Sequence, residues 1–100
     1  MKSGYNIRWT NHAKDELNQT IAYVEANFPE KILRKLATEL EKTLYLIAQN
    51  PKLFPISETI KVRRVVVLKF NTLCYQEQGK SVVILSFFSN RQDPKRSILS

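Results

Sequence analysis

The spacing of apolar residues changes near Pro51: it follows the period of a helix before this residue and the period of a strand after it. Apolar residues three or four positions apart cover one face of an α-helix, whereas alternating ones cover one face of a strand. Two helical stripes precede the change, formed by Ala13, Leu17, Ile21, Val24 and Phe28 and by Leu33, Leu36, Leu40, Leu44 and Ile47. We therefore expect helices over residues 11–26 and 29–49.

Start signals support both helices. Thr10 or Asn11 can cap the first helix with a side-chain oxygen, and we expect Asp15 and Glu16 in its first turns, where the helix dipole favours anions. Pro29 suits the first turn of the second helix because its missing N–H costs nothing there. So short a connection predicts that the helices fold back as an antiparallel hairpin with one apolar face to be covered.

Strand signals lie at both ends of the chain. Tyr5, Ile7 and Trp9 alternate with polar residues and predict a short N-terminal strand. After a loop at residues 51–59, β-rich segments cover residues 61–68, 71–77 and 81–88, with Gln78-Gly79-Lys80 as a hairpin turn. The order predicts a single α+β domain over residues 1–100, with the helical hairpin packed on a mostly antiparallel sheet that three C-terminal strands complete.

The last strand segment is apolar on both sides. A period of two places Val82, Ile84 and Phe88 on one side and Val83, Leu85 and Phe87 on the other. The helices can cover only one face of a sheet. The strand is therefore either central in a small curled sheet or covered on its second face by a partner.

Positive charge is concentrated in the second half of the chain. The net charge is +7, of which residues 51–100 carry +6, with nine basic and three acidic side chains. Such a balance favours a nucleic-acid, ribosomal or otherwise acidic partner. The candidate target- or phosphate-binding residues are Lys61, Arg63, Arg64, Lys69, Arg91, Lys95 and Arg96. We expect adjacent Arg63 and Arg64 to point to opposite faces of a strand, one serving a site and the other solvated, or either one paired with Glu58 or Glu77.

Other chemistry has little support in the sequence. The single Cys74 and single His12 predict no disulfide, metal site or cofactor. The N-terminus predicts no signal peptide and no apolar run is long enough to span a membrane, so we expect a cytoplasmic protein. Cleavage of RNA by its own 2′-hydroxyl needs a general base, a general acid and a cation, and the sequence has no tyrosine after Tyr75 and no histidine after His12.

The order of motifs nevertheless resembles one family along nearly the whole chain. The motifs are Tyr5-x-Ile7-x-Trp9, Ala13-x-x-Glu16-Leu17, Ile21-x-Tyr23, Pro51-x-x-Phe54-Pro55, Val62-Arg63-Arg64-Val65, Leu73-x-Tyr75 and Val83-Ile84-x-x-Phe87-x-x-x-Arg91-Gln92-x-Pro94. In this order they resemble the RelE/ParE superfamily of type II toxin-antitoxin toxins.

The resemblance implies a basic toxin and a cognate antitoxin that covers exposed apolar surface. We expect this contact on the last strand, at Val83, Leu85, Phe87 and Phe88. The resemblance also implies a target: ParE-like members poison DNA gyrase by binding, whereas RelE-like members cut mRNA in the ribosomal A site.

The site residues of the family can be carried over only in part. Arg63 or Arg64 and Arg91 match the phosphate-contacting arginines of RelE-like nucleases, so Arg64 and Arg91 would be catalytic if the chain is a nuclease, assisted by Lys61, Lys69 or Lys95. The tyrosine or histidine that follows the last arginine in those nucleases is missing. We therefore favour gyrase binding, with the helical hairpin and the C-terminal basic segment as contact surfaces. A nuclease and an inactive antitoxin-binding relative remain as alternatives.

Overall fold

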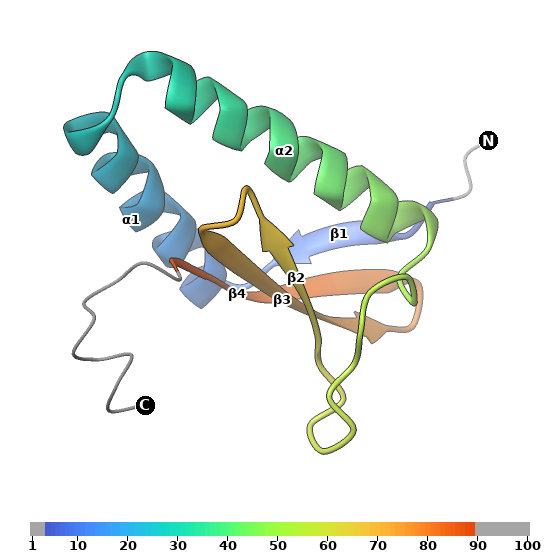
Figure 1. Cartoon of the computed structure of the whole chain (residues 1–100). Helices are drawn as coiled ribbons and strands as arrows, with labels where there is room; N and C mark the ends of the chain where they lie inside the picture. Colours follow the sequence, from blue (N-terminus) through green and yellow to red (C-terminus); the bar gives the residue numbers. More distant parts are fainter. Residues whose placement is uncertain (1–3, 90–100) are drawn as a thin grey trace.

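The computed structural model describes residues 4–89 (Figure 1). The change of period near Pro51 marks the point where the chain passes from the two helices to three of the four strands. The elements are β1 (Asn6–Trp9), α1 (Asn11–Asn27), α2 (Glu30–Gln49), β2 (Arg63–Val67), β3 (Asn71–Gln78) and β4 (Ser81–Ser89). Both helices cover one face of a four-stranded sheet. The predicted α+β fold is confirmed.

The helices begin at the expected signals. The Thr10 side chain caps α1, its Oγ1 accepting a hydrogen bond from the Ala13 N–H at 3.0 Å. Pro29 is the extended residue before α2, so that helix begins one residue later than predicted. From this turn the helices diverge as a V over the sheet (Figure 1). In the described residues neither helix is long and apolar enough to cross a membrane.

The last strand lies inside the sheet, whose order is β1-β4-β3-β2. β1 runs parallel to β4, and β3 pairs antiparallel with both β4 and β2. The helices occupy one face of this sheet, and the opposite face is called the open face below. The prediction that the doubly apolar segment is a central strand is therefore confirmed, because β4 has a neighbour on each side.

A bulge at Leu85 changes which side of β4 meets the helices. The pairs on either side of it are Tyr75 with Ile84 and Cys74 with Ser86. Because Leu85 has no partner in this register, Ile84 and Phe87 both point into the core with 0% exposure. The predicted grouping of Phe88 with Val82 and Ile84 was wrong, since an extra residue moves every later side chain to the other face.

β2 is shorter than the predicted strand at residues 61–68. Lys61, Leu68 and Lys69 have φ values of 59°, 55° and 68°, in the left-handed region where a strand cannot continue. The alternation of sides is therefore valid only within Arg63–Val67.

The core lies between the helices and the sheet. Its fully buried large side chains are Ile47, Val67, Leu73, Tyr75, Val82, Ile84 and Phe87. Of the predicted helical stripes, Ala13, Val24, Leu36, Leu40 and Ile47 are buried, and Leu17, Phe28, Leu33 and Leu44 pack against them. The period of the helices thus predicted their buried faces, except that Ile21 of the first stripe is only half-buried and is not among the residues that form or pack against the core.

Candidate functional site

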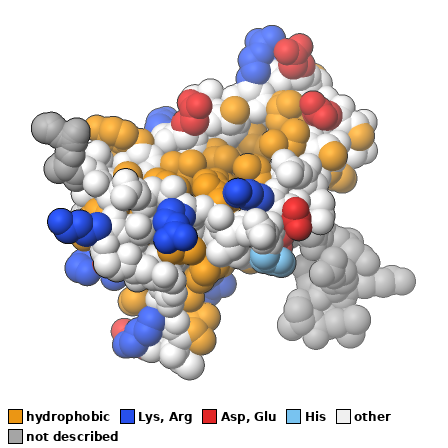
Figure 2. Space-filling view, turned by 180° about the vertical axis from the view of Figure 1, so that it is seen from behind, with side chains coloured by type: hydrophobic (Ala, Val, Ile, Leu, Met, Phe, Trp, Pro, Cys, Tyr) orange, Lys and Arg blue, Asp and Glu red, His pale blue; other side chains and the backbone are white. Residues whose placement is uncertain are grey.

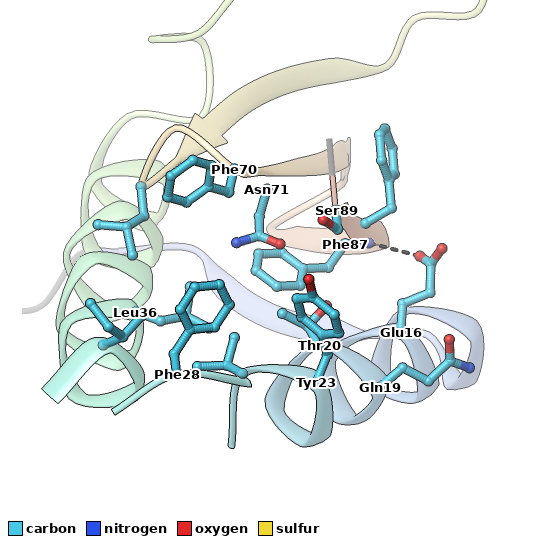
Figure 3. Close-up of a pocket in the computed structure, with 14 residues that line it drawn as sticks. Glu16, Gln19, Thr20, Tyr23, Phe28, Leu36, Phe70, Asn71, Phe87 and Ser89 are labelled. Carbon is cyan, nitrogen blue, oxygen red and sulfur yellow. Dashed lines mark hydrogen bonds between the residues drawn. The ribbon is translucent and has the colours of Figure 1, made fainter. Parts of the chain in front are cut away.

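An open apolar groove of about 730 Å³ lies between the two helices, beside the ends of β3 and β4 (Figure 3). Apolar side chains from both layers line it, among them Tyr23, Phe28, Leu36, Phe70, Phe87 and Phe88. Polar groups come from Glu16, Gln19 and Asn71. The groove exists because α1 and α2 diverge, so that the part of the sheet between them stays uncovered.

Only part of the predicted antitoxin contact lies at this groove. Phe87 and Phe88 line it, although Phe87 is fully buried. Val83 and Leu85 are absent from its lining; Val83 is 9% exposed on the open face, and Leu85 forms the bulge. The position along the strand is the reason: Phe87 and Phe88 lie near the C-terminal end of β4, which borders the groove, whereas Val83 lies near the other end of the strand.

Glu16 closes one end of the groove and also completes the edge of β4. β1 stops pairing with β4 at Ile84, so the backbone N–H of Phe87 needs another acceptor. Glu16 Oε1 accepts hydrogen bonds from this N–H at 2.8 Å and from the Ser86 hydroxyl at 2.7 Å. His12 Nε2 lies 3.3 Å from the same oxygen. A helical carboxylate therefore takes the place of the missing strand.

This role was not visible in the sequence. Asp15 and Glu16 were expected in the first turns of α1, where the helix dipole favours anions; α1 begins at Asn11 as predicted, and its first turn itself holds no acidic residue, since Asp15 is the fifth residue of the helix. The only local hint is that Glu16 follows the capped helix start by about one turn and a half. Its partners Ser86 and Phe87 are 70 and 71 residues away in the chain.

Arg63 is a structural residue on the helix side of the sheet. Its side chain is only 14% exposed; Nε contacts Glu77 Oε2 at 3.2 Å, and Nη1 donates to the Phe54 carbonyl at 2.8 Å. Lys52 Nζ contacts the other oxygen of Glu77 at 3.1 Å. Burial alone would raise the pKa of Glu77, but the hydrogen bonds and charges of Lys52 and Arg63 hold that pKa below its ordinary value. Of the alternatives that the sequence left open for the two arginines, pairing with Glu77 is the one observed for Arg63.

Arg64 projects from the open face. It pairs with Cys74, and the neighbours of Cys74 in β3, Leu73 and Tyr75, are fully buried in the core. Because successive side chains of a strand alternate, Arg64 and Cys74 point away from the helices. The question that the sequence left open is thereby answered: Arg64, and not Arg63, is presented on the open face.

The open face carries a second arginine that the sequence analysis did not select. Arg8 of β1 is exposed, and its neighbours Ile7 and Trp9 pack against the core, so Arg8 points the other way. The alternation of apolar and polar residues around Trp9 is the sequence signal that could have placed Arg8 on this face. Lys61 and Lys69, by contrast, lie beyond opposite ends of β2 and do not share one site.

A polar row crosses the open face. Arg64, Cys74 and Ser86 are register partners on three adjacent strands, and Ser86 donates to Glu16, which lies beside His12. Burial raises the pKa of the Cys74 thiol, and the charge of Arg64 acts against this effect.

The tyrosines lie elsewhere. The Tyr75 hydroxyl is buried on the helix side and donates to the Pro51 carbonyl at 2.7 Å. Burial raises its pKa, although the charge of Arg63 acts in the opposite direction. Tyr23 and Tyr45 are on the helices and Tyr5 packs against the core. In the described residues no tyrosine therefore shares the face of Arg64.

Arg91, Lys95 and Arg96 lie outside the described residues. Within residues 4–89, no three histidine, cysteine, aspartate or glutamate side chains come together in a way that could hold a metal ion.

Seen from behind, the molecule has a broad hydrophobic surface at its centre, with lysine and arginine side chains around it (Figure 2). The fold and this site define a small basic α+β domain with an apolar groove on one side of its sheet and arginines on the other.

The comparisons with known proteins agree with this description. A family model described as the ParE toxin of the type II toxin-antitoxin system, parDE, matches residues 7–94. A solved structure, "Chromosomal ParDE TA system from P. aeruginosa", is similar over 85% of this chain and 95% of that chain, with a TM-score of 0.70 and 16% sequence identity. At that identity the similarity shows the fold. Comparison with curated proteins gave no match.

Since the family model covers most of the chain, the protein belongs to the ParE toxin family and is a toxin of a type II toxin-antitoxin system. The resemblance to the RelE/ParE superfamily is confirmed.

Proposed function

We propose that this toxin stops bacterial growth by binding DNA gyrase, without cutting RNA, and that its cognate antitoxin neutralises it by filling the apolar groove. Membership of the ParE family supports gyrase as the target. The observation that carries the choice of binding over cleavage is the placement of the tyrosines. Arg64 could hold a phosphate on the open face, but Tyr75 is buried on the other side of the sheet with its hydroxyl engaged.

Gyrase inhibition can be tested by induced expression in bacterial cells while incorporation of labelled thymidine and of labelled amino acid is followed separately. We expect thymidine incorporation to fall first, with protein synthesis continuing. An immediate fall in protein synthesis would contradict the proposal. Co-expression of the antitoxin should restore thymidine incorporation, which ties the effect to the toxin.

Antitoxin binding at the groove has its own test. Phe70 lines the groove and is 42% exposed, so Phe70→Glu places a charge where the partner would bury apolar surface. We expect cells that carry this variant to lose protection by the antitoxin. Tyr45→Glu, on the outer side of α2 at 64% exposure, is the matched control and should remain protected. Equal protection of both variants would remove the groove from the proposal.

A ribosome-dependent mRNA endonuclease is the second candidate, and the polar row on the open face favours it. Arg64 could stabilise the phosphorane, while His12 and Glu16 at the end of the row could carry protons. If this is the activity, His12→Ala and Arg64→Ala abolish cleavage of mRNA, as mapped by primer extension on RNA from induced cells. If the toxin acts on gyrase, His12→Ala still inhibits DNA synthesis.

A further inference from the structure

The chain between α2 and β2 projects from the body of the molecule as a loop whose tip extends away from both the helices and the sheet (Figure 1). This target loop, as we call residues 52–62, carries three large aliphatic side chains that remain open to water. Leu53 is 49% exposed, Ile56 37% and Ile60 62%. Figure 2 shows hydrophobic side chains along the projection at the bottom, beside charged ones. Single exposed apolar residues are common, but three on one projection form a candidate contact surface.

Hydrogen bonds give the target loop a defined shape. Ser57 N–H donates to the Val62 carbonyl at 2.9 Å, and Lys61 N–H donates to the Ser57 carbonyl at 2.8 Å. Ile56 forms an isolated antiparallel bridge with Arg63. The two arms of the target loop are therefore paired like the strands of a short hairpin, and the turn between them holds Ile60.

Polar contacts at its base fix the loop to the sheet. Arg63 Nη1 donates to the Phe54 carbonyl at 2.8 Å, and Arg63 Nε contacts Glu77 on β3 at 3.2 Å. Lys52, at the start of the loop, contacts the same carboxylate at 3.1 Å. Phe54 itself packs against the core. The aliphatic side chains are thus presented by a backbone that is already ordered, which lowers the entropic cost of binding.

The target loop and the groove are distant from each other along β2. The loop enters the strand at Arg63, whereas Val67 at the other end leads to Leu68 and Phe70, which line the groove. An antitoxin segment in the groove therefore does not need the tip of the loop. A projecting apolar element suits a recess on a partner, whereas a groove suits an inserted segment.

We propose that the target loop is the element with which this toxin contacts DNA gyrase, inserting Ile56 and Ile60 into an apolar recess of the enzyme. The inference rests on the proposed function, because it names the contact surface for that target. Glu58 and Lys61 cancel in charge on the loop and Lys52 is paired with Glu77, so the contact is chiefly apolar. Arg63 is a positioning residue that holds the base of the loop.

The test uses the full-length toxin released from its complex with the antitoxin, and purified gyrase holoenzyme. Binding is measured by surface plasmon resonance and function by inhibition of supercoiling. We expect the double variant Ile56→Ser/Ile60→Ser to bind gyrase at least about 100-fold more weakly, on the order of tenfold for each buried aliphatic side chain. Its affinity for the antitoxin should remain within about twofold of wild type, which shows that it is folded.

A double variant on α2, Tyr45→Ser/Leu46→Ser, is the matched control, because these side chains are 64% and 44% exposed on another surface. It should inhibit gyrase like the wild type. If the double loop variant loses the antitoxin as well, Ile60→Ser alone decides the question, because that side chain is the more exposed of the two. Inhibition by the loop variants equal to that of wild type overturns the loop assignment alone, whereas a wild-type toxin that does not bind gyrase overturns the proposed function together with it.

Discussion

Replacement of Glu16 by alanine should destabilise the domain although the residue lies in a surface helix with a side chain 22% exposed. Its Oε1 is the acceptor for the Phe87 N–H, which β1 leaves without a strand partner. A hydrogen bond to a charged group contributes about 1.5–3 kcal/mol, and an unsatisfied buried donor costs about 1–3 kcal/mol. The Ser86 hydroxyl can turn to another acceptor and adds little.

We therefore expect Glu16→Ala to lower the free energy of unfolding by about 2–3 kcal/mol, mostly through the Phe87 N–H. In a domain of this size, each kcal/mol shifts the melting temperature by about 4–8 °C. The measurement is urea denaturation followed by circular dichroism, with the slope of the transition used to confirm two-state behaviour.

Two further variants separate the hydrogen bond from other effects of the substitution. Glu16→Gln keeps an acceptor oxygen without the charge and should lose only about 1 kcal/mol. Asp15→Ala, an exposed neighbour in the same helix, controls for helix propensity and should change stability by less than about 0.5 kcal/mol. Equal stability of Glu16→Ala and Asp15→Ala would refute the view that the carboxylate replaces a strand partner.

Two predictions concern titrating groups. Burial would raise the folded-state pKa of Glu77, but Lys52 and then Arg63 lower it below its ordinary value. The ionised Glu77 therefore stabilises the fold above its unfolded pKa of about 4.3, and this stabilisation is lost as the pH falls through the folded-state pKa. The free energy of unfolding should fall more steeply on acidification below about pH 5 in wild type than in Glu77→Gln, and parallel curves would contradict this assignment. Burial raises the pKa of Cys74 and Arg64 counteracts it, so Arg64→Ala should slow alkylation of this thiol by iodoacetamide at pH values near 8. An unchanged alkylation rate would show that Arg64 does not act on Cys74 across the open face.

Much of the fold could be read from local patterns. The helical stripes predicted both helices and their buried faces, and Thr10 predicted the first cap. These predictions succeed because capping and the period of a helix depend on residues only a few positions apart. The strands were predicted nearly as well, apart from the ends of β2, where positive φ values fall on Lys61, Leu68 and Lys69, residues that give no glycine signal in the sequence.

The candidate site was less accessible to such reasoning. The sequence placed Arg63 and Arg64 on opposite faces but could not say which face meets the helices, because alternation is symmetric until the sheet packs. The answer comes from Glu77, a partner 14 residues away, and from the burial of Leu73 and Tyr75. Phe87 was selected as a contact residue and does line the groove, but the bulge at Leu85 reversed its predicted side.

The sequence by itself determined the two layers of this toxin, the surplus of positive charge in its second half and its family. Each of these follows from composition, from the local period of apolar residues or from the order of short motifs. Only the tertiary structure decided where the surfaces lie: an open face with Arg8 and Arg64, a groove between diverging helices, and a carboxylate of α1 bonded to β4. These depend on strand register, on the angle between helices and on contacts between residues about 70 positions apart. No local pattern encodes such contacts, because they form only when the layers pack.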